Sequence, residues 1–266
     1  MNSEQSPTSR DGTPDWGPVF ADIVEAASAI ILSLWRTGLT VESKRDQSPV
    51  TEADRRGEAL ILERLAMVMG EVPVVAEEAS AAAGAPPRSI ARRFLLVDPL
   101  DGTKAFVNGE AHFTVNIALI EDGAPTSAAV AAPALGETWF TAAQGARKRA
   151  FGEAEGRPIR VRAPQAGRVL ALTSHALKDE QYAEYQARYG VTERQPMNSS
   201  LKLCILAEGG ADLYPRHGPT MEWDIAAGHA VLTAAGGRLT TPEGEPFRYG
   251  KADQGFVNGW FVARGG

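Results

Sequence analysis

The pattern of apolar and polar positions along the chain predicts alternating helices and strands. Apolar residues recur at helical spacing over about 17–37 and 52–69. Further helices are predicted near 179–189, 199–208 and 224–235. Short apolar runs predict strands near 72–76, 94–98, 113–120, 126–132, 137–142, 159–161, 169–173, 237–240 and 259–263. Strand groups that alternate with helix pairs indicate an α/β protein with stacked layers.

Three segments are expected to carry little regular structure. Residues 1–16 are predicted to form a mobile tail, 80–92 a loop or weak helix, and 144–157 a loop rich in Gly and Arg. The remainder is divided into two lobes, 17–155 and 156–266, which form one compact unit. The sequence shows no internal repeat, Walker A loop, zinc-protease helix or serine-nucleophile elbow.

The apolar run 94–97 leads into a segment with two carboxylates and a hydroxyl, Asp98-Pro99-Leu100-Asp101-Gly102-Thr103. A buried strand delivers Asp98 at its C-terminal end. Pro99 is expected to take the chain out of the sheet, so that Asp101 turns back toward Asp98. Two carboxylates, joined by the Leu100 carbonyl, are hard oxygen ligands that suit Mg²⁺. The segment therefore indicates a divalent-metal site.

The end of this segment predicts a turn as well as a site. Gly102 permits close backbone approach, and the N–H groups of Gly102 and Thr103 are expected to open a short helix that holds an anion. An Asp-Gly pair is also a strong hairpin signal. Taken alone, the segment leaves an ordinary turn open.

Other acidic residues fall where a strand or helix meets a loop. Glu77 and Glu78 close an apolar stretch, so at least one carboxylate is expected at the end of a second strand, and a solvated acidic pair is the alternative. Asp54 precedes a helix, where Thr51 and Asp54 approximate a capping box with a purely structural role. Asp224 is expected to be the N-cap of its helix, whatever else it does.

Composition and charge exclude several classes of protein. With 266 residues, of which 44% are hydrophobic, the chain can bury a large core. The net charge of −6 gives no basic footprint, so a partner of polymeric nucleic acid is not expected. The apolar stretch 30–35 is far shorter than a transmembrane span, and no signal peptide is recognised. Cys204 is the single cysteine, which favours a reducing cytoplasm. Nothing in the pattern indicates the oligomeric state.

Four motifs together resemble the inositol monophosphatase family of magnesium-dependent, lithium-sensitive phosphatases. They are VTEAD at 50–54, AEE at 76–78, DPLDGT at 98–103 and EWDIAAG at 222–228. The chain is most similar to the CysQ-type 3′(2′),5′-bisphosphate nucleotidases of that family, through LVDPLDGTK at 96–104, FTVNIALI at 113–120, SSLKLC at 199–204 and LYPRHGPT at 213–220. The resemblance implies a five-layer αβαβα sugar-phosphatase fold and a cytoplasmic enzyme, and it leaves peripheral attachment to the inner membrane open.

The resemblance also implies the metal chemistry. Two Mg²⁺ ions are held by overlapping sets of oxygen donors, Glu77, Asp98 and the Leu100 carbonyl for one and Asp98, Asp101 and Asp224 for the other. A third, weaker ion near Glu77 is left open. Two such ions stabilise the attacking and the leaving oxygen of an in-line displacement. Thr103 paired with Asp54 orients the attacking water and draws off its proton, so the catalytic residues are Asp54, Thr103 and Glu77.

The substrate residues are likewise implied by the resemblance: Lys44, Gly102, Thr103, Ser174, His175, Ser199, Lys202, Arg216 and Asp224. Lys202 and Arg216 bind the 5′-phosphate of a nucleotide, where charge-assisted donors are needed. His175 lies near the base or ribose, and the loop that carries Lys44 closes over the phosphate. Ordinary solvated roles for His175, Lys44 and Lys202 stay open. Ala105 and His217 depart from the pattern of close relatives.

Three functions compete. The leading hypothesis is a phosphatase that removes the 3′-phosphate of adenosine 3′,5′-bisphosphate, a small by-product of sulfate assimilation. A sister phosphatase acting on inositol monophosphate or histidinol phosphate is the second. A non-catalytic phosphate-binding protein is the third, and the clustered acids argue against it, because without a metal they would repel one another.

Overall fold

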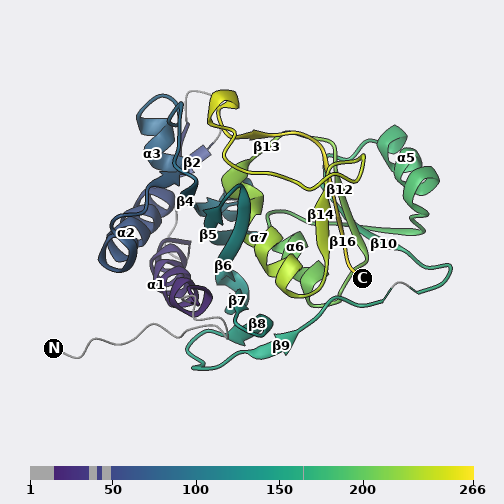
Figure 1. Ribbon diagram of the computed structural model, residues 1–266, viewed down its shortest axis with the longest axis horizontal. Helices are drawn as coiled ribbons and strands as arrows, with labels where there is room; N and C mark the ends of the chain where they lie inside the picture. The colour runs from purple at the N-terminus through teal and green to yellow at the C-terminus, as the bar shows by residue number, and fades with distance from the viewer. Residues whose placement is uncertain (1–14, 36–40, 44–48, 164) are drawn as a thin grey trace.

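The computed structural model describes residues 15–35, 41–43, 49–163 and 165–266. Most of the expected tail, the end of the first expected helix and Lys44 lie outside these residues. Within them, a seven-stranded sheet has the order β3-β4-β5-β6-β7-β8-β9 and a five-stranded sheet has the order β11-β10-β12-β16-β14. The two sheets alternate with helices across the molecule (Figure 1).

The seven-stranded sheet carries the first half of the chain. Its strands are β3 (Val74–Ala76), β4 (Arg93–Asp101), β5 (Thr114–Glu121), β6 (Ala124–Ala132), β7 (Glu137–Ala142), β8 (Gly145–Ala150) and β9 (Arg157–Ile159). Helices α1 (Gly17–Trp35) and α2 (Glu52–Met69) cover one face of this sheet. Their apolar stripes pack against inward side chains of β4, β5 and β6, and this packing forms one hydrophobic core.

Helices α6 (Leu201–Ala207) and α7 (Glu222–Ala234) lie between the two sheets. The five-stranded sheet consists of β10 (Leu170–Thr173), β11 (Glu193–Pro196), β12 (Leu213–Arg216), β14 (Arg238–Thr240) and β16 (Phe261–Arg264). Helix α5 (Asp179–Tyr189) covers its outer face, where Tyr185 packs on Leu213 and Val262. The layers therefore run helix, sheet, helix, sheet, helix, which confirms the expected αβαβα architecture.

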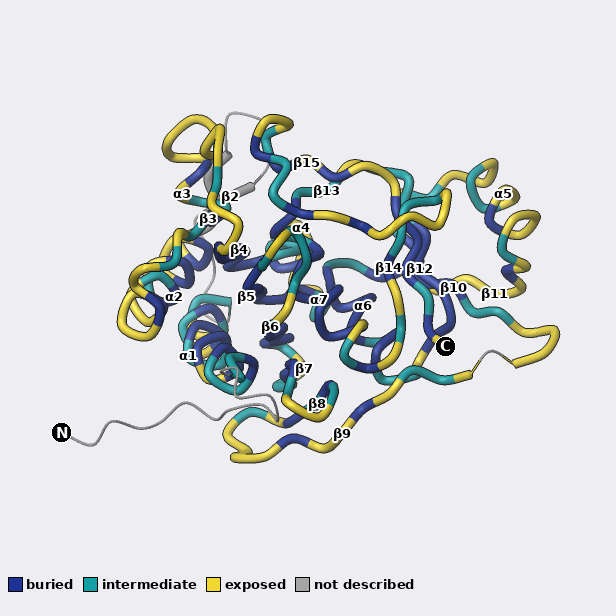
Figure 2. Tube along the Cα trace, in the orientation of Figure 1, coloured by how far each residue is buried: buried dark blue, intermediate teal, exposed yellow. Residues whose placement is uncertain are grey.

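The remaining elements are short. They are β1 (Val41–Ser43), β2 (Pro49–Thr51), α3 (Glu77–Ala82), α4 (Thr103–Val107), β13 (Thr220–Met221), β15 (Val257–Asn258) and 3₁₀ turns at Pro133–Leu135 and Ala252–Gln254. Figure 2 shows the buried stretches concentrated in the two sheets and the inner helices, with exposed residues along α3 and α5. Helices α3 and α4 begin directly after strands β3 and β4, which places both at one end of the larger sheet.

The expected loop over 144–157 was wrong, because β8 occupies 145–150 and β9 begins at 157. Strand β8 escaped the pattern because two of its charged side chains form ion pairs and are shielded from solvent. Arg149 is buried against Asp22 and Glu25, and Lys148 lies 2.9 Å from a carboxylate oxygen of Glu137. Buried charge that is paired does not leave an apolar signature in the sequence.

Helix α1 is the one described helix that is long and apolar enough to cross a membrane. The apolar stretch 30–35 forms the last part of this helix and is by itself too short to cross a membrane. In the structure α1 packs on α2, β6 and β7, and Phe20, Val24 and Ile31 are fully buried. The indole of Trp35 donates a 3.1 Å hydrogen bond to the Phe106 carbonyl. The apolar surface of α1 is thus used as core of the fold.

Candidate active site

A bulge in β4 brings two carboxylates to the same face of the sheet. Asp98 pairs with Asn116 of β5, and Asp101 pairs with Thr114, so two residues of β4 stand opposite one of β5. Side chains alternate between faces along a regular strand, and Asp98 and Asp101 would then point to opposite sides. The extra residue restores them to one face. Pro99 was expected to end the strand, and this was wrong: β4 continues through the bulge to Asp101.

The neighbouring strand places a third carboxylate beside this pair. β3 runs parallel to β4, and Ala76 pairs with Val97. Glu77 follows Ala76 and is therefore next to Asp98 at the shared carboxyl end of the two strands. Burial is the main cause that raises the pKa of the Asp98 carboxyl, and the negative charge of Glu77 is the next largest.

Asp224 brings a fourth carboxylate from α7. It was expected to be the N-cap, and this was wrong: α7 begins at Glu222, and Asp224 is the third helical residue. One Asp224 oxygen accepts a 2.8 Å hydrogen bond from the Met221 N–H, which fixes the carboxylate at the first turn. An acid in this position also interacts favourably with the helix dipole.

The four carboxylates interact electrostatically. Burial raises the pKa of Asp98 well above its usual value, and the charges of Glu77, Asp101 and Asp224 raise it further. Burial, with the charges of Asp101 and Glu77, does the same to Asp224. Carboxylates that disfavour one another's ionised form are stabilised by a nearby cation.

The donor chemistry of this cluster fits a hard divalent cation. Within the part of the chain that the structure describes, no three acidic, histidine or cysteine side chains already form a complete set of metal ligands. The cluster nevertheless offers buried carboxylate oxygens and the adjoining Leu100 carbonyl, all of them hard donors. Mg²⁺ prefers such oxygens and completes its octahedron with water and substrate phosphate. The residues present therefore fit Mg²⁺ by chemistry.

Thr103 lies next to this cluster at the start of α4. Its hydroxyl is 3.1 Å from the Leu100 carbonyl and 3.4 Å from an Asp54 carboxylate oxygen on α2. A hydroxyl has one proton, so it donates to one of these two acceptors at a time. Gly102 precedes it with a φ of 93°, and a Cβ there would lie 3.0 Å from the His112 carbonyl. The expected short helix and the close approach at Gly102 are both found.

A hydrogen-bond network around Asp101 was missed by the sequence analysis. The Ser200 backbone N–H donates to the Asp101 carboxylate, and the Ser200 hydroxyl is 2.8 Å from Thr114 Oγ1 and 2.7 Å from Asn116 Oδ1. Two polar residues at alternate positions of an apolar strand, Thr114 and Asn116, were the available signal. The network joins α6 to β5 and orients Asp101.

Lys202 is buried, not an exposed helix residue. Its amine donates hydrogen bonds to the Met197 carbonyl at 3.0 Å and to the Ser199 carbonyl at 2.6 Å. Burial lowers the pKa of the Lys202 amine to about 7, and the charge of Asp101 opposes this shift. Lys202 thus supports the chain on both sides of Asn198 and contributes positive charge near Asp101.

Two cavities meet at Arg216. The first, the carboxylate cavity, has a volume of about 120 Å³ and is lined by Asp101, Asp224, Ser199, Lys202, Tyr214 and Arg216 among others. The second, the α5 pocket, has a volume of about 190 Å³ and is lined by Ser174, Lys178, Gln181, Tyr185, Arg216 and His217 among others. Arg216 belongs to both linings, so the two cavities are neighbours.

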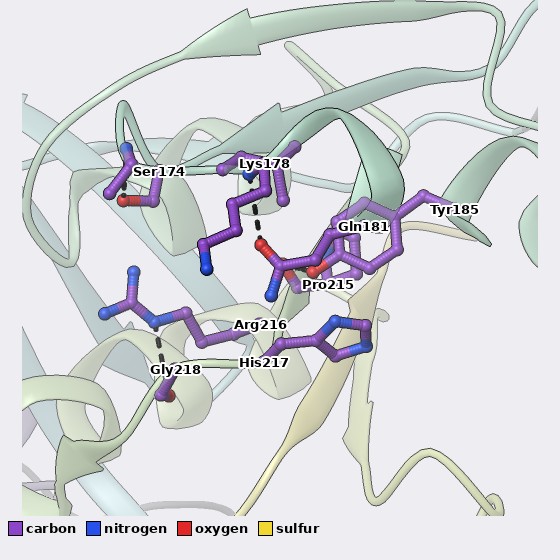
Figure 3. Close-up of a pocket in the computed structure, with 10 residues that line it drawn as sticks. Ser174, Lys178, Gln181, Tyr185, Pro215, Arg216, His217 and Gly218 are labelled. Atoms are coloured by element: carbon purple, nitrogen blue, oxygen red, sulfur yellow. Dashed lines mark hydrogen bonds between the residues drawn. The ribbon is translucent and has the colours of Figure 1, made fainter. Parts of the chain in front are cut away.

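The α5 pocket contains two cationic side chains. Figure 3 shows the charged ends of Lys178 and Arg216 extending toward the same open space. The Lys178 backbone N–H donates a 3.1 Å hydrogen bond to the Gln181 side chain, which fixes the start of α5. Lys178 and Gln181 were not singled out in the sequence analysis, because an exposed lysine and glutamine at a helix start carry no distinctive pattern.

Two histidines near this pocket differ in role. His175 is exposed and is not among the described residues that line either cavity, while its neighbour Ser174 lines the α5 pocket. His217 packs between two aromatic rings, with centroid distances of 4.9 Å to Tyr185 and 4.2 Å to Trp260. The imidazole of His217 therefore packs as an aromatic ring between Tyr185 and Trp260.

Residues 18–261 match the model of the inositol monophosphatase family. The chain belongs to the inositol monophosphatase family. The 3′(2′),5′-bisphosphate nucleotidase CysQ of Escherichia coli (strain K12) is 42% identical over 213 residues, which cover 79% of this chain and 83% of that protein. The crystal structure of CysQ from Bacteroides thetaiotaomicron has a TM-score of 0.75 at 32% identity, covering 93% of this chain and 96% of that one.

Another relative is named for a different activity. The histidinol-phosphatase of Mycobacterium tuberculosis is 34% identical over 218 residues, covering 77% of this chain and 79% of that protein. The comparisons agree on a phosphatase of the inositol monophosphatase family and on its layered fold. The cluster of Asp98, Asp101 and Asp224 is accordingly the candidate active site.

Proposed function

We propose that the protein is a magnesium-dependent 3′(2′),5′-bisphosphate nucleotidase that hydrolyses the 3′-phosphate of adenosine 3′,5′-bisphosphate to AMP and phosphate. The observation that carries this proposal is the shared wall at Arg216, between the carboxylate cavity and the α5 pocket. A substrate with one phosphate at the carboxylates and a second near Arg216 uses both cavities. The relatives named as CysQ nucleotidases support the same substrate class.

The carboxylates and one carbonyl would hold the metal. Glu77, Asp98 and the Leu100 carbonyl form one set of donors, and Asp98, Asp101 and Asp224 form the other. When bound, Mg²⁺ supplies Lewis-acid stabilisation of the charge that develops on the phosphoryl oxygens. The Ser200 N–H and the network behind it hold Asp101 in place for this role.

Thr103 and Asp54 would handle the proton of the attacking water. The Thr103 hydroxyl has acceptors at 3.1 and 3.4 Å, so it can turn from the Leu100 carbonyl to Asp54 with little movement. In that orientation its oxygen accepts a proton from water while its own proton moves to the Asp54 carboxylate. Asp54 is buried, which keeps this acceptor away from bulk solvent.

The second phosphate would be bound by cations. Arg216 offers several N–H donors in a fixed plane, and its Nε atom reaches the Gly218 carbonyl at 3.4 Å, which leaves the terminal nitrogens for a ligand. Lys202 lines the carboxylate cavity together with Arg216 and adds positive charge there. Lys44, outside the described residues, and His175 keep their proposed substrate roles. We also propose that the enzyme acts in the cytoplasm, on a by-product of sulfate assimilation.

A phosphate-release assay tests the proposal. The protein is incubated with Mg²⁺ and adenosine 3′,5′-bisphosphate, inositol 1-phosphate or histidinol phosphate, and the kcat/KM values are compared. We expect the highest kcat/KM for the bisphosphate and strong inhibition by millimolar Li⁺. A preference for inositol 1-phosphate or histidinol phosphate would move the assignment to a sister activity. The Asp98→Asn variant serves as the control for contaminating phosphatases.

A further inference from the structure

Glu58 is a buried acid that the proposed mechanism does not use. It lies on α2, four residues after Asp54, so both side chains extend from the same face of that helix. One carboxylate oxygen of Glu58 accepts a 2.8 Å hydrogen bond from the Glu78 N–H, and the other accepts a 2.7 Å bond from the Ala79 N–H. Both oxygens are therefore engaged by the first turn of α3.

This contact caps a helix that lacks a cap of its own. The residue before α3 is Ala76, which has an extended backbone (φ −120°, ψ 148°) and makes no side-chain cap hydrogen bond. The first N–H groups of a helix have no partner inside it and need an acceptor from elsewhere. Glu58 provides that acceptor from a different helix, through both oxygens of its carboxyl group.

The cap bears directly on Glu77. Glu77 is the first residue of α3, with Ala76 on one side and Glu78 on the other. Ala76 is held by its pairing with Val97 of β4, and Glu78 is held by Glu58. The backbone of Glu77 is thus fixed at both ends, by the sheet on one side and by α2 on the other.

We propose that Glu58 is a positioning residue that holds Glu77 in place as a metal ligand and couples it to Asp54 through α2. This inference rests on the proposed function, because it takes Glu77 as a ligand of Mg²⁺. We assign Glu58 to the support of α3 and not to the metal, because each of its oxygens accepts a hydrogen bond from the backbone of that helix. Helix α2 then positions two groups, the proton acceptor Asp54 directly and the metal ligand Glu77 through Glu58.

The variant Glu58→Gln tests the proposal by metal binding. Glutamine keeps one acceptor oxygen and presents an NH₂ donor to the second N–H, so one hydrogen bond is lost. The lost hydrogen bond leaves the start of α3, and with it Glu77, less firmly held. The Mg²⁺ affinity should therefore fall about tenfold or more. Isothermal titration of the full-length protein with Mg²⁺ alone measures this, and kcat at saturating Mg²⁺ should fall by less than about threefold.

Two further variants keep the test specific. Glu63→Gln removes the same charge from an exposed position of α2 and should bind Mg²⁺ as the wild type does. Glu58→Asp keeps the charge with a shorter reach, and it should also weaken Mg²⁺ binding. Thermal melting in EDTA shows whether each variant is folded, and Mg²⁺ affinity is compared among folded variants.

The outcomes separate this inference from the proposed function. Wild-type Mg²⁺ affinity in folded Glu58→Gln, or an equal loss in Glu63→Gln, would overturn the positioning role. A fall in kcat at saturating Mg²⁺ with unchanged affinity would overturn it as well. If the wild-type protein neither binds Mg²⁺ nor releases phosphate, it is the proposed function that fails.

Discussion

The carboxylate cavity and the α5 pocket share Arg216, but they are built in different ways. In the carboxylate cavity, a strand bulge and a helix start fix Asp101 and Asp224, and both are held by backbone N–H groups. In the α5 pocket, Lys178 comes from the exposed connection before α5. Chemistry that needs precise geometry lies on rigid elements, while recognition is left to side chains that can adjust.

The largest effect is expected at Asp98, which interacts with Asp101 and Asp224 of the carboxylate cavity. Asp98→Asn removes the carboxylate that both metal sites share, so kcat should fall by about a thousandfold or more. Because burial and repulsion raise the pKa of Asp98, losing its charge should not lower the melting temperature measured in EDTA. Phosphate release and thermal melting check both parts. Near-wild-type turnover would contradict the metal assignment.

Next in size is the effect of the proton-handling pair. Thr103→Ala and Asp54→Asn should each lower kcat about a hundredfold or more. If the two act as one unit, the double variant should lose little beyond either single variant. Steady-state kinetics of the four proteins give the coupling. Independent, additive losses would favour separate structural roles, with Asp54 acting only in the first turn of α2.

The effect of replacing Arg216 should differ between substrates with one phosphate and substrates with two. Arg216→Ala should lower kcat/KM for adenosine 3′,5′-bisphosphate roughly ten- to a hundredfold, because charge-assisted hydrogen bonds to the second phosphate are lost. Hydrolysis of a substrate with one phosphate should barely change. Steady-state kinetics with adenosine 3′,5′-bisphosphate and with adenosine 3′-monophosphate give the two kcat/KM values to be compared. Equal losses on both would place Arg216 at the reacting phosphate.

Lys202 offers a matched contrast on the same two substrates. Its amine is buried on the carbonyls of Met197 and Ser199. If it mainly braces this turn, Lys202→Met should lower kcat/KM about equally for both substrates and reduce the melting temperature. A loss confined to the bisphosphate would instead show direct binding of the second phosphate. The ratio of the two kcat/KM values distinguishes these roles.

The smallest effect lies outside both cavities. Burial lowers the pKa of His229 from 6.5 to about 4, and its Nδ1 lies 2.9 Å from the Tyr249 hydroxyl. Between these pH values the unfolded chain binds the extra proton, so the free energy of unfolding should fall as pH drops from 6.5 toward 4. The contribution is at most about 3 kcal/mol. Urea unfolding of the wild type and of His229→Gln at pH 7 and pH 5 measures this contribution. An equal fall in the free energy of unfolding of both proteins would show that His229 is not the cause.

The sequence predicted those parts of the fold and site that follow from local pattern. The helices 52–69 and 179–189 have their expected bounds, and the layered architecture is confirmed. The sequence predicted a carboxylate of Glu77 or Glu78 at the end of a second strand; β3 ends at Ala76, directly before Glu77, and the pairing of Ala76 with Val97 brings Glu77 beside Asp98. Strand ends and helix faces are readable because their hydrophobic period is local.

The parts that could not be predicted depend on distant partners. In the polar strand β8, Arg149 is paired with carboxylates of α1, more than a hundred residues away in the chain. The Ser200 network and the Glu58 cap likewise join segments that no local pattern connects. The continuation of β4 through Pro99 was missed because a bulge, and not a strand end, accommodates the proline.

The bulge in β4 determines what a change of length would do at this point of the chain. Deleting one of the two residues between Asp98 and Asp101 would give a regular strand, in which positions two apart share a face, so both carboxylates would stay on the same side of the sheet. The deletion would instead remove the irregular backbone that presents the Leu100 carbonyl to the Thr103 hydroxyl at 3.1 Å. The number of residues in this segment therefore matters for the backbone oxygen donor more than for the two carboxylates.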